Sequence, residues 1–467
     1  MIEKIFKAYD VRAIYPEPLS EDAAWRVGYG TAGYLKGLYG GKSVDGVSKG
    51  DTVVVGRDMR PHSPVLVKAL IAGLRAGGMS VIDIGMIDTS MIYFAINHLG
   101  AVGGIMTTAS HNPVEYNGFK ISGPKAKPIG SSSGLEDIKK IAVATTDSKL
   151  PPANGTKLEK QDIWAAYRKH VLGFLDLKRP LNVVVDASNG MAGKMVPAVF
   201  GGVPNLTIVP VLFEVTGSFV HDPNPLVEKN LEYLRVTLKK TPDADLGACF
   251  DGDADRCIFT DEVGTTIGCD LMTALLAKDF LAKPENKAAA IVYDLRSSHV
   301  VKDVVLAAGG VPVRDRVGHA FIKKTLAEKN AVFGGELSGH FYFRDNFFAD
   351  SGAIAFARLL SVLSAQPKKL SAVMAPFHKY FATGEVNFIV EDKDGTIKLL
   401  EQKYGGVGGK VDFLDGITVE LDGWWFNVRK SNTEPLLRLN LEAKSAGLRD
   451  DKFGELKAIL GHPAEGH

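Results

Sequence analysis

One pattern recurs three times along the chain and constrains its fold more than any other feature. A short, β-branched apolar run ends in a polar loop at 52–60, 182–190 and 290–298. Each is followed by a second apolar run that leads into a longer polar loop, at 103–113, 246–256 and 331–340. Short buried strands that alternate with helical segments are typical of α/β architecture. The repetition therefore predicts three related α/β modules, each of which presents one major loop.

The first repeat carries enough local signals to predict individual elements. Residues 20–40 are expected to form a helix with Ser20 as its N-cap. Residues 52–56 and 81–85 are expected to form strands, because both are short and rich in β-branched residues. Ser63 precedes a proline, a pair that predicts a helix start with Ser63 as the cap.

The chain has 467 residues and is too long for a single hydrophobic core. A segment rich in Pro, Gly, Ser and Lys at 146–160 is typical of a linker. Strand-like runs dominate after residue 380, which indicates a smaller α+β module at the C-terminus. We predict four domains, at 1–153, 154–264, 265–374 and 375–467.

Composition narrows the classes of partner. The formal net charge is +1, so no global electrostatic attraction to nucleic acid or to an acidic membrane is expected. Three cysteines without CxxC spacing predict reduced thiols and neither a zinc knuckle nor a disulfide framework. No signal-peptide core and no apolar run of about 18 residues is found. We expect a cytoplasmic protein, monomeric or homodimeric, that binds small molecules.

The strongest local signal is a triplet of carboxylates, Asp251, Asp253 and Asp255, which follows an apolar run. Three clustered carboxylates repel one another unless a cation lies between them, and oxygen ligands favour Mg²⁺ or Ca²⁺. A set this small fits Mg²⁺ better. An EF-hand is the competing interpretation, because Glu262 matches its twelfth position. However, the sixth position requires glycine and is Arg256 here. A solvated acidic turn is the simpler alternative.

A second loop, 107–113, places Ser110 among small residues that leave its hydroxyl accessible. His111 follows directly, and Lys120 lies downstream within plausible reach. The surrounding sequence lacks the Gly-x-Ser-x-Gly pattern of an α/β-hydrolase nucleophile. Taken alone, a serine-rich turn is more often a helix cap.

Two further loops offer sugar- and phosphate-binding groups. In the loop 334–340, Glu336 and Ser338 alternate and could face the hydroxyls of one sugar, although a glycine-rich turn is the alternative. Arg429 begins a later loop whose guanidinium, hydroxyl, amide and backbone groups form a plausible phosphate site. That loop is also expected to be a hairpin turn. The segment 36–43 resembles a nucleotide-binding P-loop but lacks its first glycine, and we set this interpretation aside.

Together the four loops resemble those of the α-D-phosphohexomutase family. TTASHNP, DGDADR, GGELSGH and RKSNTEP occur in the family's order, and FKAYDVR at 6–12 resembles its N-terminal motif. The resemblance implies three related α/β domains with mixed sheets. It also implies a C-terminal α+β domain similar to the TATA-box-binding-protein fold, all around a central cleft.

The resemblance also assigns roles to residues. It implies that Ser110 is a phosphoserine and that Mg²⁺ is held by its phosphate and by Asp251, Asp253 and Asp255. The sugar would be held by Glu336, Ser338 and His340. The non-reacting phosphate would be held by Arg429, Ser431, Asn432, Thr433 and Arg296. Further active-site positions would be Arg12, His111, Lys120, Arg256 and His319.

Three positions depart from the family pattern. Ala13 and Ala254 replace glycines, which removes backbone freedom. Arg296 stands where many members carry lysine, which keeps the charge and changes its geometry.

The implied activity is interconversion of hexose 1-phosphate and hexose 6-phosphate through a hexose 1,6-bisphosphate, with the C-terminal domain closing over the substrate. Mannose phosphates, and glucose phosphates as well, are the expected substrates, because Leu337 resembles that subgroup. The alternatives are a phosphoglucosamine mutase, a metal-dependent sugar phosphatase or a non-catalytic sugar-phosphate-binding protein.

Overall fold

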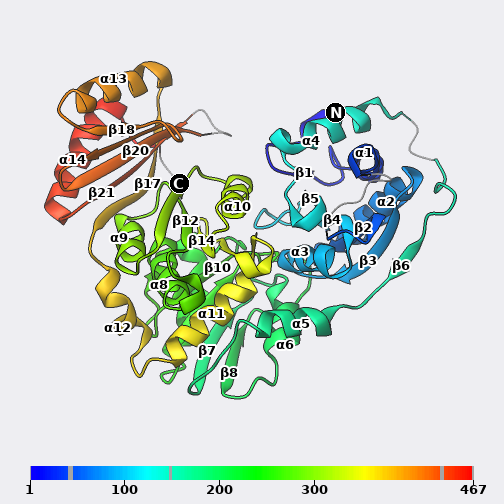
Figure 1. Cartoon of the computed structure of the whole chain (residues 1–467), viewed down its shortest axis with the longest axis horizontal. Helices are drawn as coiled ribbons and strands as arrows, with labels where there is room; N and C mark the ends of the chain where they lie inside the picture. Colours follow the sequence, from blue (N-terminus) through cyan, green and yellow to red (C-terminus); the bar gives the residue numbers. More distant parts are fainter. Residues whose placement is uncertain (1, 40–45, 147–149, 432–435, 465–467) are drawn as a thin grey trace. The chain divides into compact units, whose positions relative to one another are not determined.

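The computed structural model describes residues 2–39, 46–146, 150–431 and 436–464 (Figure 1). The chain divides into two compact units. The first comprises Met1–Ile267 and Ser338–Val373, and the second comprises Gly268–Leu337 and Met374–His467. Among the described helices, none combines the length and apolarity that crossing a bilayer would require.

The first module of the first unit is a six-stranded mixed sheet in the order β1-β5-β4-β2-β3-β6. Its strands are β1 (Val11–Ile14), β2 (Lys49–Arg57), β3 (Ser80–Met86), β4 (Ala101–Thr107), β5 (Tyr116–Ser122) and β6 (Leu158–Lys160). Its helices are α1 (Glu21–Tyr39), α2 (Ser63–Ala76), α3 (Thr89–His98) and α4 (Leu135–Ala144). The predicted helix at 20–40 and the strands at 52–56 and 81–85 are confirmed as α1, β2 and β3.

The local helix signals were right in one case and wrong in the other. Ser20 caps α1, because its hydroxyl oxygen accepts a hydrogen bond from the Ala23 N–H at 3.2 Å. The prediction for Ser63 was wrong: His62 is the N-cap residue of α2, and Ser63 already lies inside the helix. The Ser63 hydroxyl instead donates to Asp58 Oδ1 at 2.5 Å, because a buried carboxylate competes for it.

The second module repeats this plan around the order β11-β10-β9-β7-β8. Its strands are β7 (Leu181–Asp186), β8 (Leu206–Val211), β9 (Leu246–Phe250), β10 (Cys257–Thr260) and β11 (Thr266–Ile267). Its helices are α5 (Trp164–Leu172), α6 (Ala192–Phe200) and α7 (Glu232–Lys239). The cysteines Cys249, Cys257 and Cys269 are all buried thiols.

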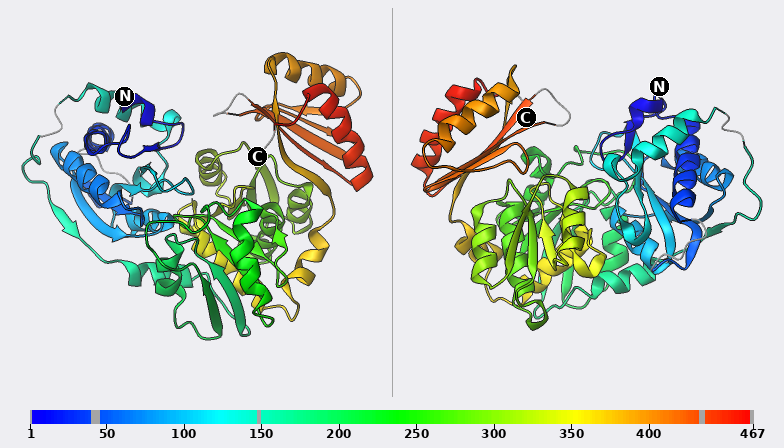
Figure 2. Two further views of the ribbon diagram at one scale, coloured as in Figure 1. Left: turned by 180° about the vertical axis from the view of Figure 1, so that it is seen from behind. Right: turned by 45° about the horizontal axis from the view of Figure 1, so that its top comes forward.

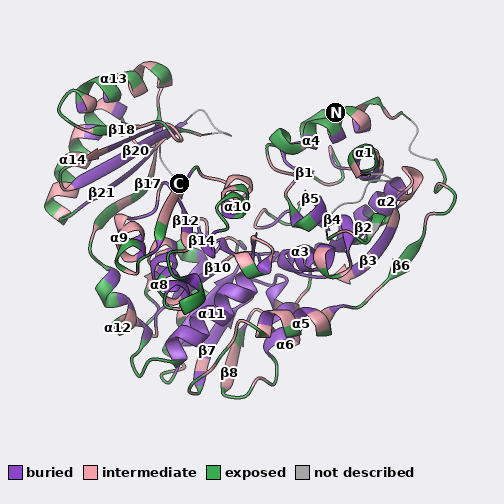
Figure 3. Ribbon diagram, in the orientation of Figure 1, coloured by how far each residue is buried: buried purple, intermediate pink, exposed green. Residues whose placement is uncertain are grey.

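Helix α11 (Gly352–Ser364) also belongs to the first unit and is buried along its whole length (Figure 3). A helix that is apolar all round belongs in a core. Its Phe356 packs edge-on against Phe200 of α6 and Phe250 of β9, with ring centroids 5.1 and 5.9 Å apart. The last residue of β9, directly before the aspartate triplet, is thereby fixed in the core.

The third module contributes elements to both units. Its strands are β12 (Ala290–Asp294), β13 (Val311–Asp315), β14 (Phe333–Gly335), β15 (Phe341–Phe343) and β16 (Ala349–Asp350). Its helices are α8 (Cys269–Leu281), α9 (His299–Ala307) and α10 (His319–Glu328), and α12 (Leu370–Met374) follows. Short 3₁₀ helices span Ile2–Ile5, Pro124–Ala126, Ser131–Ser133, Glu228–Leu231, Pro284–Asn286, Arg344–Asn346 and Ala375–Phe377.

Strand pairing confirms the predicted repetition. We call β2, β7 and β12, which carry the first apolar run of each repeat, the first strands of the repeats. Each pairs in parallel with two neighbours: β2 with β3 and β4, β7 with β8 and β9, and β12 with β13 and β14. Because adjacent parallel strands end at the same edge of the sheet, the turn after each first strand lies beside the major loop after β4, β9 or β14. The three major loops therefore occupy equivalent places.

The C-terminal sheet, coloured orange to red in Figure 2, differs because all its pairings are antiparallel, in the order β17-β21-β20-β19-β18. Its strands are β17 (Phe381–Ile389), β18 (Lys410–Asp412), β19 (Ile417–Leu421), β20 (Trp424–Lys430) and β21 (Leu436–Ala443). Helices α13 (Lys393–Gly405) and α14 (Ala446–Leu460) share one apolar core with it. The predicted fold class is confirmed. The likeness to the TATA-box-binding-protein fold and the four domain boundaries stay predictions.

Helices α1 and α2 approach each other closely enough that only glycine fits at their contact. A Cβ at Gly73 would lie 1.9 Å from the Trp25 carbonyl oxygen, and one at Gly28 would lie 2.2 Å from that of Leu70. Backbone atoms cannot move aside as a side chain can. The two helices are therefore fixed over the first sheet by glycine.

We predict that Gly73→Ala destabilises the protein by about 1–3 kcal/mol or more, because the added methyl group forces the two helices apart. Gly37→Ala is the control, since Gly37 lies in α1 with no atom within 4 Å of an added Cβ. That change should be neutral or stabilising by up to about 1 kcal/mol. Thermal unfolding of both variants measures the difference, and equal midpoints would contradict the packing described.

Candidate active site

Two loops of the first unit meet at Ser110. One follows β4 and carries Ser110, and the other joins β9 to β10 and carries the aspartate triplet. The Ser110 hydroxyl donates to Asp251 Oδ2 at 3.1 Å, and only 2% of the serine is exposed. A Cβ at Gly252 would lie 2.6 Å from the Ser110 carbonyl oxygen, so the two backbones are in direct contact.

The aspartate triplet lies on a tight turn between antiparallel strands, where Cys257 faces Phe250. Asp251 closes the turn, because its carbonyl accepts from Ala254 N at 3.1 Å and its Oδ1 accepts from Arg256 N at 3.2 Å. Ala254 has φ +59°, a left-handed conformation that costs about 1–2 kcal/mol for a residue other than glycine. The turn curls all three carboxylates to one side.

The EF-hand alternative is wrong, because strands and not helices flank this turn. Glu262, its supposed twelfth ligand, instead accepts hydrogen bonds from the backbone and hydroxyl of Ser371. The solvated acidic turn is also wrong, since all three aspartates are buried.

The three carboxylates interact strongly. Oxygens of Asp251, Asp253 and Asp255 lie within 4.8 Å of one another. Burial raises the pKa of Asp251 well above its usual range, and the Asp255 and Asp253 carboxylates raise it further. Burial also disfavours the Asp255 anion, but Lys120 and His340 outweigh this and hold its pKa well below the usual range.

The cluster has the properties of a cation site. Its donors are oxygens, which suit Mg²⁺ or Ca²⁺. Asp253 Oδ2 accepts from Thr89 Oγ1 at 2.5 Å, whereas its buried Oδ1 has no hydrogen-bond partner among the described residues. A buried carboxylate oxygen without a hydrogen-bond partner destabilises the folded protein unless a cation binds it. The residues present therefore fit a divalent metal.

A second group of possible ligands shares one member with the triplet. Asp255, His340 and Asp350 are buried and also bring their ligand atoms within 4.8 Å of one another. His340 Nε2 lies 3.5 Å from Asp255 Oδ1. Asp350 carries no recognisable sequence signal, because it follows a run without a known motif.

Cationic side chains surround the two loops. Lys120 on β5 lies 2.8 Å from Asp253 Oδ2 and 2.5 Å from Asp255 Oδ2. Burial opposes its charge, but these carboxylates outweigh burial and raise the Lys120 pKa above its ordinary value. Arg256 Nε lies 3.7 Å from Asp251 Oδ2. Lys120 is thus charged and poorly suited to accept a proton in this state.

His111 differs from Lys120 in its charge. Burial lowers the His111 pKa well below its usual range, and the cations Arg256 and Arg12 lower it further. Its Nδ1 lies 3.3 Å from Ser110 Oγ, so a neutral imidazole faces the hydroxyl. Arg12 is held nearby on β1, donating to Asn112 Oδ1 at 2.6 Å.

Part of the predicted sugar loop lies against the same site. Ser338 Oγ is 2.9 Å from His340 Nδ1, and Arg256 Nε donates to His340 Nε2 at 3.4 Å. The first unit therefore brings together ten predicted site residues: Arg12, Ser110, His111, Lys120, Asp251, Asp253, Asp255, Arg256, Ser338 and His340.

The second unit contains the other predicted residues. Glu336, at the end of β14, is buried, and its Oε1 accepts from Gly318 N at 3.0 Å. Gly318 is the N-cap residue of α10, and His319 begins that helix. Glu336 and His319 are therefore positioned together at one helix terminus, where a carboxylate is favoured.

Three arginines of the second unit surround Glu385. Arg429 Nη2 lies 2.8 Å and Arg438 Nη1 3.1 Å from its carboxylate, and Arg296 Nη1 lies 3.6 Å away. Arg438 also donates to Ser431 Oγ at 3.2 Å. Asp294 also pairs with Arg296 at 2.8 Å, so three cations meet two anions, which leaves a local excess of positive charge. Asn432 and Thr433 lie outside the described residues.

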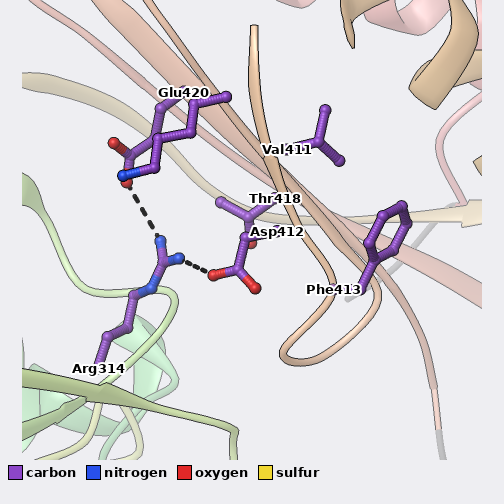
Figure 4. Close-up of a pocket in the computed structure, with 7 residues that line it drawn as sticks. Arg314, Val411, Asp412, Phe413, Thr418 and Glu420 are labelled. Carbon is purple, nitrogen blue, oxygen red and sulfur yellow. Dashed lines mark hydrogen bonds and ion pairs between the residues drawn. The ribbon is translucent and has the colours of Figure 1, made fainter.

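A pocket of about 450 Å³ in the second unit contains none of the predicted residues (Figure 4). Arg314 on β13 points toward Asp412 and Glu420, and its Nη1 lies 3.5 Å from Glu420 Oε1. Arg314 is thus paired with both acidic side chains of the wall. These ion pairs link β13 to the C-terminal sheet.

Several site residues were missed by sequence reasoning, namely Asp58, Arg60, Thr89, Asp350, Glu385 and Arg438. Most are single polar residues far from any motif, and only folding brings them to the site. Arg60 did carry a signal. Its Asp-x-Arg pattern at 58–60 recurs at 294–296, within the repeated segments.

We predict that Asp251→Asn removes metal binding but does not destabilise the metal-free protein at pH 8. Because the folded pKa of Asp251 is raised, its ionisation lowers folded stability as pH rises through that pKa. Thermal unfolding in chelator should therefore give a midpoint at least as high as that of the unchanged protein. Added MgCl₂ should raise the midpoint of the unchanged protein but not that of Asp251→Asn.

The control for this experiment is Asp222→Asn, which changes an exposed carboxylate of the same module. It should keep the response to MgCl₂. A metal-dependent midpoint shift in Asp251→Asn equal to that of the control would rule out Asp251 as a ligand.

Comparison with known proteins agrees with this geometry. Profiles described as phosphoglucomutase/phosphomannomutase alpha/beta/alpha domains I, II and III match residues 3–149, 165–264 and 269–380. The profile of the C-terminal domain of the same family matches residues 385–451.

Individual relatives extend along nearly the whole chain. A phosphomannomutase of Escherichia coli K12 is 39% identical over 451 residues, 94% of each chain. The crystal structure of a phosphoglucomutase/phosphomannomutase family protein from Burkholderia thailandensis superposes with a TM-score of 0.87 at 32% identity and covers 99% of both chains. An Aspergillus fumigatus N-acetylphosphoglucosamine mutase, solved with GlcNAc-6P and magnesium, has a TM-score of 0.58 at 14% identity and covers 94% of this chain and 98% of its own. The chain belongs to the phosphoglucomutase/phosphomannomutase family.

Proposed function

We propose that this protein is a phosphohexomutase that interconverts hexose 1-phosphates and hexose 6-phosphates, with mannose and glucose phosphates as its substrates. The observation that carries the proposal is the Ser110 hydroxyl, 3.1 Å from a buried carboxylate of the aspartate triplet and surrounded by cations. The E. coli phosphomannomutase, similar over 94% of its length, supports the choice of sugar.

Mg²⁺ is the metal proposed for the aspartate triplet. Asp251, Asp253 and Asp255 would hold it, together with the phosphate of a phosphorylated Ser110. When bound, the ion would supply positive charge to neutralise a phosphoryl group in transfer. The magnesium in the Aspergillus mutase supports this choice.

The chemistry proposed for Ser110 is reversible transfer of a phosphoryl group. A free sugar hydroxyl loses its proton and forms the new O–P bond, while the bond from Ser110 Oγ to phosphorus breaks. The 1,6-bisphosphate then turns around and returns its other phosphoryl group to Ser110. Arg256 and Lys120 would stabilise charge on the transferring group.

Two residues near Ser110 have different parts in proton movement. His111, neutral and 3.3 Å from Ser110 Oγ, is the proposed proton acceptor, because its depressed pKa leaves Nδ1 or Nε2 with a lone pair. Lys120 is charged in the metal-free state and is proposed as a proton donor. His319 is the alternative acid or base.

The remaining predicted residues would hold the substrate. Glu336, Ser338 and His340 are proposed to hold the sugar. The non-reacting phosphate is proposed to bind Arg296, Arg429 and Ser431, with Asn432 and Thr433. The cluster of three arginines in the second unit supports this assignment, because Glu385 and Asp294 together do not neutralise three guanidiniums. The proposed mechanism requires the residues that hold the sugar and the residues that hold the phosphate to bind the same bisphosphate molecule.

We predict that Ser110→Ala reduces mutase turnover by at least about 1,000-fold, because the phosphoryl acceptor is lost. A coupled assay of hexose 6-phosphate formation from hexose 1-phosphate, with trace 1,6-bisphosphate, measures the effect. Ser131→Ala, an exposed serine of the same module, is the control and should be fully active. Unchanged turnover in Ser110→Ala would remove Ser110 from the mechanism.

A substrate panel tests the proposed specificity. Mannose and glucose 1-phosphates should both be converted, and glucosamine 1-phosphate at least about 10-fold more slowly, since discrimination by one sugar substituent is worth roughly 1–3 kcal/mol. Inorganic phosphate should not accumulate. Preference for glucosamine 1-phosphate would indicate a phosphoglucosamine mutase, and phosphate release without isomerisation would indicate a phosphatase.

A further inference from the structure

Arg60 lies at the end of the first repeat and is completely buried. Its guanidinium uses every one of its N–H donors. Nε donates to Asp58 Oδ2 at 3.1 Å. The other four N–H groups donate to backbone carbonyls of the loop that carries Ser110: Pro113 at 2.6 Å, Tyr116 at 3.1 Å, Ser110 at 2.9 Å and Asn112 at 2.6 Å.

The arginine is itself held rigidly. Asp58 is buried and receives hydrogen bonds from Arg60 N at 3.0 Å and from Ser63 Oγ at 2.5 Å. The Phe219 ring covers the guanidinium, with its centroid 5.3 Å from the central carbon. A buried charge is tolerated only when it is fully paired, and here the loop carbonyls complete the pairing. The buried guanidinium therefore needs the loop carbonyls as partners, and the loop needs the guanidinium to hold its conformation.

This contact explains the conformation of Ser110. The serine has φ +52°, the left-handed region, which is unfavourable for a residue other than glycine. Such strain persists only where the surroundings fix it. Arg60 binds the carbonyls of Ser110 and Asn112, and Thr108 Oγ1 accepts from Ser110 N at 2.9 Å. The conformation that results aims Ser110 Oγ at Asp251.

The same relation recurs in the other modules. Each turn after a first strand begins with an aspartate that accepts from the N–H two residues later, at 3.0, 2.8 and 2.8 Å for Asp58, Asp186 and Asp294. In the second module, Ser188 Oγ donates to the Phe250 carbonyl at 2.7 Å, directly before the aspartate triplet. In the third, Asp294 Oδ2 accepts from Leu337 N at 2.8 Å. Each turn thus supports the adjacent major loop.

We propose that Arg60 is a positioning residue that holds Ser110 in the conformation needed for phosphoryl transfer. In each of the three modules the turn after β2, β7 or β12 supports the adjacent major loop, and Arg60 provides this support in the first module. The proposal rests on the proposed function. Arg60 does not touch the reacting atoms. It acts through the backbone of the Ser110 loop.

Arg60→Lys tests this role, because lysine keeps a charge but has three donors that cannot reach four carbonyls and Asp58 together. We expect kcat to fall about 100-fold, the effect of roughly 1 Å of misplacement, with KM changed less than 3-fold. Phosphorylation of Ser110 by hexose 1,6-bisphosphate, followed by intact-protein mass spectrometry, should slow by the same factor. Affinity for Mg²⁺ should be unchanged, because the aspartate triplet is untouched.

Arg168→Lys is the matched control. Arg168 also donates to two backbone carbonyls, those of Ala198 and Val199, but at the end of α6. It should keep wild-type kcat. Ser63→Ala provides a milder second variant in case Arg60→Lys does not fold, because it leaves Arg60 in place and removes one donor from Asp58 and one acceptor from Asn117. We expect a 3- to 10-fold fall in kcat for this variant.

Hydrogen exchange separates this proposal from the proposed function. Amides of the segment 110–116 should exchange at least 10-fold faster in Arg60→Lys, or in Ser63→Ala to a smaller extent, than in Arg168→Lys. Unchanged exchange in that segment, or an unchanged rate of Ser110 phosphorylation, would overturn the role of Arg60. If the wild-type protein converts no hexose phosphate while the exchange result holds, the proposed function fails and the structural support remains.

Discussion

Repulsion among three buried carboxylates is the constraint on which the site depends. Asp251, Asp253 and Asp255 lie within 4.8 Å of one another with almost no exposure. Such an arrangement is stable only if cations are close, and Lys120 from the first module supplies one, while Arg256 from the second supplies another. The carboxylates thereby join two modules of the first unit. The charges of the aspartate triplet, Lys120 and Arg256 therefore contribute both to the stability of the fold and to the candidate site.

The three modules share a scaffold and differ in the chemistry of one loop each. The first strand of every repeat, β2, β7 or β12, pairs in parallel with the strand that leads into the major loop. The turn beside it begins with aspartate in all three cases, but the supporting group is an arginine, a serine hydroxyl or the aspartate itself. The geometry of this support is similar in the three modules, whereas the supported loops carry the Ser110 hydroxyl, the aspartate triplet, and Glu336 with Ser338.

Short stretches of sequence predicted the local features of the fold, but they did not predict contacts between residues far apart in the chain. Strand runs and the carboxylate triplet follow from short windows, so the fold class and the main loops could be anticipated. The predicted linker at 146–160 overlaps strand β6, which pairs with β3 in the first sheet. Ser63 shows the limit, because its hydroxyl bonds Asp58 in place of capping a helix. Arg60 and Thr89 contact loops roughly 50 and 160 residues away. No spacing rule in a single sequence encodes such pairs.

The electrostatics of the second unit are the reverse of those of the first. Arg429 and Arg438 face each other on paired strands, where like charges destabilise a sheet unless an anion intervenes. Glu385 intervenes, and the same arginines hold its pKa below the usual range although burial opposes this. With Arg296, which Asp294 also pairs, three guanidiniums meet two carboxylates. In the first unit three carboxylates meet two cations, Lys120 and Arg256. One unit therefore has an excess that suits a metal cation and the other an excess that suits a phosphate, and a metal-assisted sugar-phosphate reaction needs both.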